Sequence, residues 1–161
     1  MTAHEDRDRD EEFMRLAIVA SQRAVMNGNM PFGSTLVRDR SVLHVSGNNQ
    51  RTTSDCTGHA EVVLLREAAS KHGVAALSGA TVYASGEPCA MCSGAMFWAG
   101  IARVVYAATN QDIIDALGGP CLTLRCEDVM RSGDRAVSVE GPLMRDDAVA
   151  VLRAFARSGG G

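Results

Sequence analysis

Two short motifs, which together hold one histidine, one glutamate and two cysteines, constrain this sequence more than any other feature. The first reads His59-Ala60-Glu61, and further along the chain the second reads Pro88-Cys89-Ala90-Met91-Cys92. Histidine nitrogen and cysteine thiolate are ligands that zinc prefers, and three protein ligands leave one position of a tetrahedral zinc open for water. The motifs therefore predict a fold that brings two distant segments together around one zinc ion, with hydrolysis as its chemistry.

The thiols and the carboxylate have separate predicted roles. Cys89 and Cys92 are three residues apart, so within a helix they share a face and can hold one ion. The partial positive charge of a helix N-terminus favours thiolate over thiol. Glu61, two positions after His59, can lie beside the metal without ligating it. We expect Glu61 to move a proton from water to the substrate as a general acid–base catalyst.

A structural zinc site is the alternative to this catalytic interpretation. Cys56 lies three residues before His59, so these two residues and the cysteine pair could close a cage of four ligands. Such a cage stabilises folding and performs no chemistry. Because Cys56 falls in a polar loop, and because Glu61 would then have no purpose, we favour the open site. Cys121 and Cys126 are interpreted as ordinary thiols, since they lack metal-like spacing.

Composition narrows the class of protein. A chain of 161 residues with 46% hydrophobic residues suits one domain, residues 1–161. The formal net charge is −3 and no run of Lys and Arg occurs, which disfavours a nucleic-acid partner. No apolar stretch approaches the roughly 20 residues that span a bilayer. An odd number of cysteines (five) and a charged N-terminus without an apolar signal core predict a cytoplasmic protein.

Apolar periodicity predicts alternating helices and strands. Helices are expected over residues 10–27, 58–71, 89–98 and 146–156. Strands are expected over 34–38 and 42–45, joined as a hairpin, and over 81–84, 103–107 and 136–140. Residues 47–57 are interpreted as a polar loop, residues 1–9 as a charged tail and residues 158–161 as a flexible tail. This alternation predicts a layered α/β domain whose sheet is at least partly parallel.

The motifs in this order resemble those of the cytidine-deaminase-like superfamily, and within it the branch of bacterial guanine and cytosine deaminases. The resemblance covers residues 10–115, and besides the zinc motifs it rests on Pro31-Phe32-Gly33, Gly47-Asn48-Asn49, Thr57-Gly58, Met96-Phe97-Trp98-Ala99-Gly100 and Val104-Val105-Tyr106-Ala107. It implies a three-layer α/β/α sandwich with a central mixed sheet of about five strands. It also implies a homodimer that holds Zn²⁺ through His59, Cys89 and Cys92 and acts on a small nucleobase.

The resemblance further implies roles for four residues around the substrate. Asn48 would hydrogen-bond the base and Phe32 would stack on its ring. The backbone N–H of Ala60 would meet a carbonyl oxygen of the substrate, and Trp98 would form a wall of the pocket. From the residues alone, Asn48 also fits an asparagine-rich turn, and Phe32 and Trp98 also fit core packing.

Two departures from the branch leave the substrate open. Guanine deaminases carry an acidic residue in the loop after the strand that matches 104–107, where this chain has Gly118-Gly119-Pro120-Cys121. Asp112 or Asp115, slightly earlier, could substitute for it. The final helix resembles the segment that crosses over a neighbour's site in those dimers, but here it ends in glycines.

The sequence therefore predicts a zinc-dependent deaminase of a free nucleobase or close analogue, which releases ammonia. Guanine, a modified purine such as isoguanine, cytosine and a triazine are all considered. The alternatives are a tRNA adenosine deaminase and a non-catalytic zinc module. The tRNA enzymes typically carry Asp-Pro-Thr-Ala-His-Ala-Glu, where this chain reads Asp55-Cys56-Thr57-Gly58-His59-Ala60-Glu61.

Overall fold

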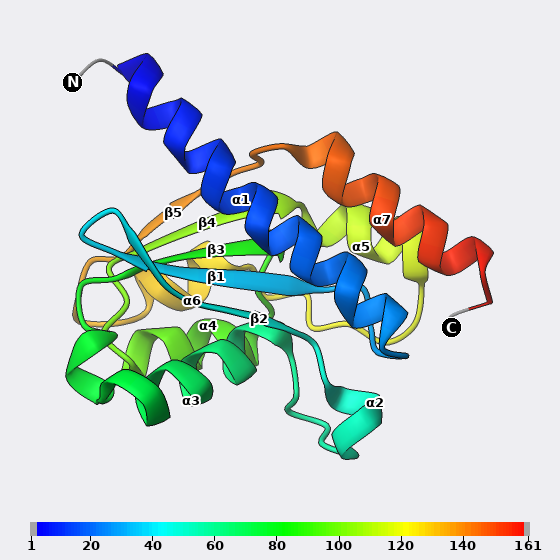
Figure 1. The fold of residues 1–161 in the computed structure, drawn as a ribbon, viewed down its shortest axis with the longest axis horizontal. Coiled ribbons are helices and arrows are strands. Elements are labelled where there is room, and N and C mark those ends of the chain that lie inside the picture. The colour runs from blue at the N-terminus through cyan, green and yellow to red at the C-terminus, as the bar shows by residue number, and fades with distance from the viewer. Residues whose placement is uncertain (1–2, 160–161) are drawn as a thin grey trace.

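A five-stranded mixed sheet forms the centre of the molecule. The structure, a computed structural model, describes residues 3–159. In sequence order the strands are β1 (Gly33–Arg38), β2 (Ser41–Gly47), β3 (Thr81–Gly86), β4 (Arg103–Ala108) and β5 (Ser138–Glu140). Their order across the sheet is β2-β1-β3-β4-β5. β1 pairs antiparallel with β2 and β3, whereas β3, β4 and β5 run parallel (Figure 1). The predicted hairpin and the mixed sheet are confirmed.

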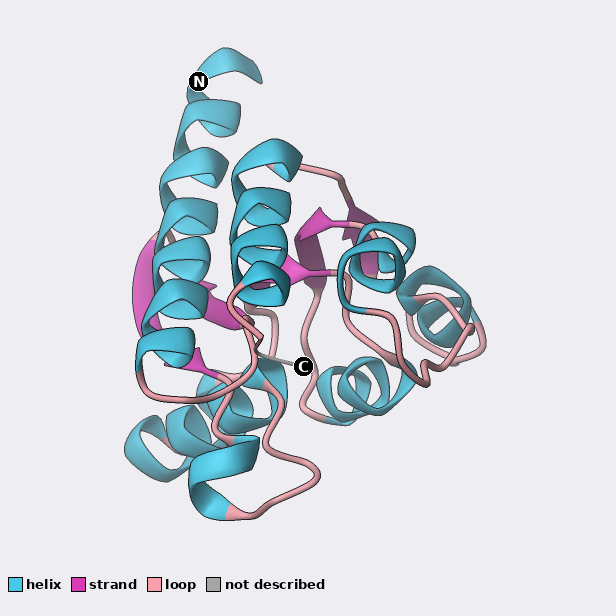
Figure 2. Cartoon of the chain, turned by 90° about the vertical axis from the view of Figure 1, so that its right-hand side faces the viewer, coloured by secondary structure: helices cyan, strands magenta, loops and turns pink. Residues whose placement is uncertain are grey.

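Helices cover both faces of this sheet. They are α1 (Ala3–Met26), α2 (Gln50–Thr53), α3 (Ala60–His72), α4 (Ala90–Trp98), α5 (Asn110–Leu117), α6 (Cys126–Arg131) and α7 (Arg145–Arg157), with a 3₁₀ turn at Val74–Ala76. Helices α1, α5 and α7 lie on one side and α3 and α4 on the other (Figure 1). Figure 2 shows the long helices α1 and α7 side by side. The predicted three-layer α/β/α sandwich is thus confirmed.

Alternation along the strands divides the hydrophobic core into two. Successive strand residues point to opposite faces, so neighbours contribute to different clusters. On β3, Val82 packs in the core beneath α3 and α4, whereas Tyr83 packs in the core beneath α1 and α7. Val104 and Val105 on β4 divide in the same way. Both faces of β3 and β4 are therefore buried, as expected for strands covered by helices on each side.

The N-terminal residues correct one prediction. Residues 3–9, expected as a charged tail, form the first turns of α1. Their charges suit a solvated helix, because Arg7 pairs with Glu11 one turn later and acidic residues open the helix. Asp10 fastens this part of α1 to the sheet by accepting hydrogen bonds from Arg103 at 2.7 and 2.9 Å.

Three further elements differ from the sequence prediction. The polar loop 47–57 contains the single helical turn α2, and α5 and α6 were not predicted at all. Helix α5 begins with a capping box between Thr109 and Asp112, which the spacing Thr-x-x-Asp could have indicated. At the other end of the chain, Ser158 and Gly159 follow α7, and residues 160–161 of the predicted flexible tail lie outside the described residues. No helix within 3–159 combines the length and the apolar character that crossing a membrane requires.

A close approach between α1 and β1 depends on the absence of a side chain at Gly33. A Cβ atom there would lie 2.2 Å from the carbonyl oxygen of Ala17 and 2.4 Å from the backbone nitrogen of Ser21. Both are backbone atoms of α1, so the helix itself would have to move. We therefore expect Gly33→Ala to lower the free energy of unfolding by about 3 kcal/mol or more, measured by urea denaturation.

Gly94→Ala is the matched control. Gly94 lies within α4 and a Cβ there meets nothing within 4 Å, so alanine should raise stability by about 0.5–1 kcal/mol through its helix propensity. Equal stability of the Gly33→Ala variant and the wild type would contradict this account of the α1–β1 contact.

Candidate active site

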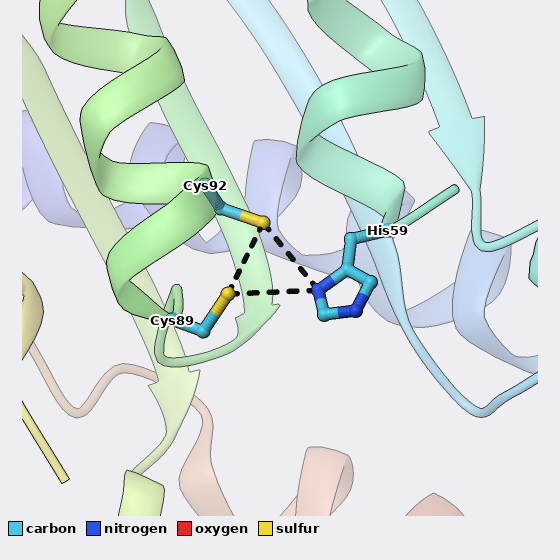
Figure 3. A group of neighbouring side chains, drawn as sticks. All are labelled: His59, Cys89 and Cys92. Carbon is cyan, nitrogen blue, oxygen red and sulfur yellow. Dashed lines mark hydrogen bonds between the residues drawn. The ribbon is translucent and has the colours of Figure 1, made fainter. Parts of the chain in front are cut away.

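Three ligand atoms from the two sequence motifs meet at one point (Figure 3). Nδ1 of His59 lies 3.6 Å from Sγ of Cys89 and 3.5 Å from Sγ of Cys92, and the two sulfur atoms are 3.6 Å apart. Zinc bonds of about 2.3 Å to sulfur and 2.0 Å to nitrogen, at tetrahedral angles, place ligand atoms roughly 3.5–3.8 Å apart. The spacing of these three atoms therefore fits a zinc ion with one position left for water.

Two helix N-termini hold the ligands. His59 is the N-cap residue of α3 and Cys89 that of α4, both with extended backbone, and Cys92 follows in the first turn of α4. Pro88 therefore directly precedes the N-cap residue and lies outside the helix. Ser34 on β1 donates a hydrogen bond to the carbonyl oxygen of Ala60 at 2.8 Å, which fixes the start of α3 to the sheet.

The ligands also have the electrostatics of a metal site. Hydrogen bonds with Cys92 and His59 lower the pKa of Cys89 to about 4 against the opposing effect of burial. The same bond to Cys89, together with burial, raises the pKa of Cys92. Hydrogen bonding to Cys89 likewise raises the pKa of His59. A cation bound to all three groups would favour the deprotonated form of each, because metal ligands bind without their protons.

Glu61 lies beside the ligands as a buried carboxyl group. It is the second residue of α3 and only 6% exposed, yet it lines the same cavity as His59 and Cys89. Burial raises the pKa of Glu61 above its usual range. A buried carboxyl group with a raised pKa, next to a metal site, has the properties of a proton shuttle.

The arrangement of the cysteines bears on the structural zinc cage. Within the described part of the chain, His59, Cys89 and Cys92 form the group whose ligand atoms converge, and Cys56 is not a member. Cys56 is exposed instead, and Cys126 is buried in the core beneath α3 and α4. The geometry therefore favours three ligands over four.

A cavity of about 560 Å³ opens over Glu61 and the ligand group. Its lining combines apolar side chains with a few polar groups; the residues are Met30, Phe32, Gln50, Arg51, His59, Glu61, Gly86, Glu87, Cys89, Asn110, Ile113, Ile114, Leu117, residues 118–122, Phe155 and Ala156. A Cβ atom on Gly86 would lie 3.1 Å from Phe32 and 2.9 Å from Ile113, so glycine there gives both side chains room. The predicted site residue Phe32 is thus placed in the wall of the cavity.

Trp98 is not where the resemblance implied. It is the last residue of α4 and 85% exposed, and its ring packs edge-on against Phe97 at 5.6 Å. A helix of nine residues is roughly 13 Å long, so its final residue is carried away from the metal ligands at its start. Trp98 therefore does not line the cavity of its own chain, and this geometry does not support the prediction that it forms a wall of the pocket.

Asn48 and Ala60 lie next to the cavity without being part of its lining. Asn48 is buried, accepts a hydrogen bond from the backbone N–H of Gln50 at 3.1 Å, and donates one to the Gln50 side chain at 2.8 Å. These bonds hold the turn that leads into α2, as the alternative interpretation of Asn48 expected. Contacts of Asn48 and Ala60 with a base stay predictions.

Neither candidate for the missing carboxylate faces the cavity. Asp112 accepts hydrogen bonds from Arg145 and Thr109, and Asp115 is exposed and accepts one from Gln111. Residues 118–122 line the cavity instead. They belong to the segment 118–124, which lies between α5 and α6 outside helix and strand and is here called the wall segment. The prediction that Asp112 or Asp115 replaces the loop carboxylate is therefore not supported by this geometry.

The final helix covers the cavity of its own chain. Arg145 in its first turn pairs with the buried Asp112 of α5, and α7 also packs against α1 and β4. Its last turn places Phe155 and Ala156 in the cavity lining, and the guanidinium of Arg51 lies 5.6 Å from the Phe155 ring centre. The crossing of this helix to a neighbour's site, which the resemblance implied, stays a prediction.

Several residues of the cavity were not found from the sequence. Glu87 directly precedes Pro88 in the second zinc motif, so its position next to a ligand was a usable signal. Gln50, Arg51, Asn110 and Phe155 come from α2, α5 and α7, and no motif connects them. Only the tertiary structure brings these helices to the metal ligands.

The choice between three and four ligands can be tested by metal content. We expect Cys56→Ala to keep about one zinc per chain, because the exposed Cys56 thiol is not part of the ligand group. Cys92→Ala, which removes one of the three converging ligands, should lose most of it. Elemental analysis of the purified variants measures both, and zinc loss in Cys56→Ala would establish the closed cage.

Comparison with known proteins agrees with this geometry. Residues 7–108 match the cytidine and deoxycytidylate deaminase zinc-binding region. The chain is 33% identical over 162 residues to the probable cytosine deaminase of Schizosaccharomyces pombe, covering 96% of this chain and 97% of that protein. It is 37% identical over 107 residues to the guanine deaminase of Bacillus subtilis, covering 66% and 69%.

A solved structure from work on tRNA:A34 deaminases is also similar. It matches with a TM-score of 0.73 and 30% identity, over 88% of this chain and 99% of that one. The family match spans more than half of the chain and contains both zinc motifs. By sequence, fold and site geometry, the chain belongs to the family of zinc-binding cytidine and deoxycytidylate deaminases and is a hydrolytic deaminase.

Proposed function

We propose that this deaminase acts on a free nucleobase or a close analogue, and that His59, Cys89 and Cys92 bind its zinc ion. The cavity over Glu61 carries the proposal. It is largely apolar, with Phe32, Ile113 and Ile114 able to contact a flat ring, and a few polar groups reach into it. Pockets of this kind enclose small planar ligands. Similarity to the cytosine deaminase and the guanine deaminase supports the same class of substrate.

The overall reaction replaces an exocyclic amine by oxygen. Water adds to the ring carbon that carries the amine, the carbon–nitrogen bond breaks, and ammonia leaves. When bound, zinc supplies the Lewis acidity that makes water nucleophilic near neutral pH. The residues of the chain then have to hold the ring in place and move two protons.

Glu61 is proposed to move both protons. Its buried carboxylate takes one proton from the attacking water and delivers it to a ring nitrogen. It then takes the second proton from the hydroxyl group that the water has left on the ring carbon and delivers it to the amine, which leaves as ammonia. The raised pKa of Glu61 suits this exchange, because a carboxylate that binds a proton more tightly is a better base.

Stacking and hydrogen bonding are proposed to orient the base. Phe32 offers its ring to the face of the base, Asn48 an amide to its edge, and Ala60 a backbone N–H to a carbonyl oxygen. The wall segment is neutral from Gly118 to Leu122, which favours a base that needs no carboxylate there. Cytosine, a triazine, isoguanine and guanine are the substrates to test, and we propose a cytoplasmic homodimer as the working form.

A tRNA adenosine deaminase is the second candidate, favoured by the similar tRNA deaminase structure. A chain with a formal net charge of −3 is a weaker partner for phosphates than a basic one. Inosine formation in tRNA, with affinity that falls steeply with salt, would establish this function instead.

A panel of substrates tests the proposal. Zinc-loaded protein is incubated with free bases, their nucleosides and a tRNA, and released ammonia is measured. We expect ammonia from at least one free base and a lower kcat/KM for the matching nucleoside. No release from any base by protein with full zinc content would reject the proposed function.

Replacing Glu61 separates catalysis from metal binding. Because Glu61 lies outside the converging ligands, Glu61→Gln should keep the zinc content. Loss of the proton carrier should lower kcat by about 10²–10⁴-fold. The exposed Glu67 of the same helix, changed to Gln, is the control and should keep full activity. Wild-type kcat in Glu61→Gln would contradict the assigned role.

A further inference from the structure

A buried carboxylate outside the predicted proton shuttle lies at the edge of the cavity. Glu87 follows β3 and precedes Pro88, two residues before the ligand Cys89. Its side chain is 2% exposed, and its backbone N–H donates to the carbonyl oxygen of Ala108 at 2.7 Å. Glu87 is therefore fixed in the turn that carries the metal ligand.

Two groups compensate this buried charge. Arg125 donates a hydrogen bond from Nε to the carboxylate at 2.6 Å, and the backbone N–H of Asn110 donates one at 2.9 Å. Asn110 is the first residue of α5, and Arg125 is the N-cap residue of α6. One carboxylate thus ties the starts of two helices to the metal-binding turn, and a buried charge makes such bonds stronger than exposed ones.

The wall segment lies between those two helices. All of residues 118–124 are exposed, and Gly118 and Gly119 have φ angles of +64° and +79°. At one end the N–H of Gly118 donates to the carbonyl oxygen of Ile114, and at the other Arg125 contacts Glu87. The exposed part of this segment has little packing of its own, so its position over the cavity depends on where its ends are held.

We propose that Arg125, held by Glu87, is a positioning residue that fixes the wall segment over the cavity and so determines how tightly the substrate is bound. This inference rests on the proposed function for its substrate. The contact between Arg125 and Glu87 acts through the wall segment, because Arg125 itself does not line the cavity. The contact involves neither a zinc ligand nor Glu61, so binding and specificity should respond to it more than the chemical step does.

Substitution of Arg125 tests the proposal, with the best base of the panel as substrate. We expect Arg125→Ala to raise KM about five- to tenfold while kcat changes by about twofold or less and zinc content stays at the wild-type value. Arg125→Lys keeps a charge but loses the fixed guanidinium geometry, so it should restore KM in part. Discrimination between small and large bases should weaken most in Arg125→Ala and less in Arg125→Lys.

Arg131→Ala provides the matched control on the same helix. Arg131 pairs with Glu127 one turn earlier, and both side chains are more than half exposed. Such a pair contributes little, so KM should stay at the wild-type value. An equal rise of KM in both alanine variants, or an unchanged KM in a folded, zinc-loaded Arg125→Ala variant, would overturn the proposal.

A readout that needs no turnover separates this proposal from the proposed function. Cys121 lies in the wall segment and is exposed, so in a Cys56→Ser background it can carry a fluorescent label. The label's anisotropy should fall in Arg125→Ala and stay unchanged in Arg131→Ala. Failure of every base in the panel rejects the proposed function, whereas unchanged anisotropy rejects the positioning role.

Glu87→Gln keeps the test decisive if Arg125→Ala does not fold. Glutamine retains an oxygen for the N–H of Asn110 but loses the charge that holds Arg125. Because Glu87 also lines the cavity, anisotropy is the deciding measurement for this variant. We expect KM to rise and anisotropy to fall, the fall being smaller than in Arg125→Ala. Wild-type values in both Glu87→Gln and Arg125→Lys would also overturn the proposal.

Discussion

The meeting of two helix N-termini at one edge of the sheet is the arrangement on which the rest of this molecule depends. His59 opens α3 and Cys89 opens α4, and their ligand atoms come within 3.6 Å of each other. Partial positive charge at both helix ends stabilises thiolate, and the hydrogen bonds among the ligands lower the pKa of Cys89 to about 4. The parallel pairing of β3 with β4 carries the second motif to this edge.

The cavity is built by different elements from those that build the metal site. Helix α5 supplies an apolar side, α7 reaches the opening with Phe155, and the wall segment borders it between α5 and α6. Two contacts of buried carboxylates hold these parts: Asp112 with Arg145 fastens α7 to α5, and Glu87 with Arg125 fastens the start of α6. Neither contact involves one of the three converging ligands, so the parts of the cavity are held separately from the metal site.

Much of the fold was predictable because its local signals agree with its packing. The hairpin, the strands β3 and β4 and the helices α3, α4 and α7 all have apolar residues at the spacing that their burial requires. The first turns of α1 were not predicted, because residues 3–9 are mostly charged and such a stretch is also typical of a solvated tail. The contact of Asp10 with Arg103, which holds this part of the helix against the sheet, is seen only in the structure. Helix α6 is six residues long, too short for a periodic pattern, and only the burial of Cys126 and Met130 explains it.

The sequence alone determined the chemistry. Histidine, glutamate and the paired cysteines have the ligand types and spacing of a zinc site with a proton shuttle, and those properties belong to the residues themselves. The tertiary structure decided which neighbours join them: it exposed Trp98 at the far end of α4, left Cys56 outside the ligand group, and brought Phe155, Arg51 and Glu87 to the cavity. The physical reason is that the ligands lie in two short segments at the starts of α3 and α4, so their spacing can be seen in the sequence. The cavity is formed by helices that are distant in the sequence and meet only because they pack against the same sheet.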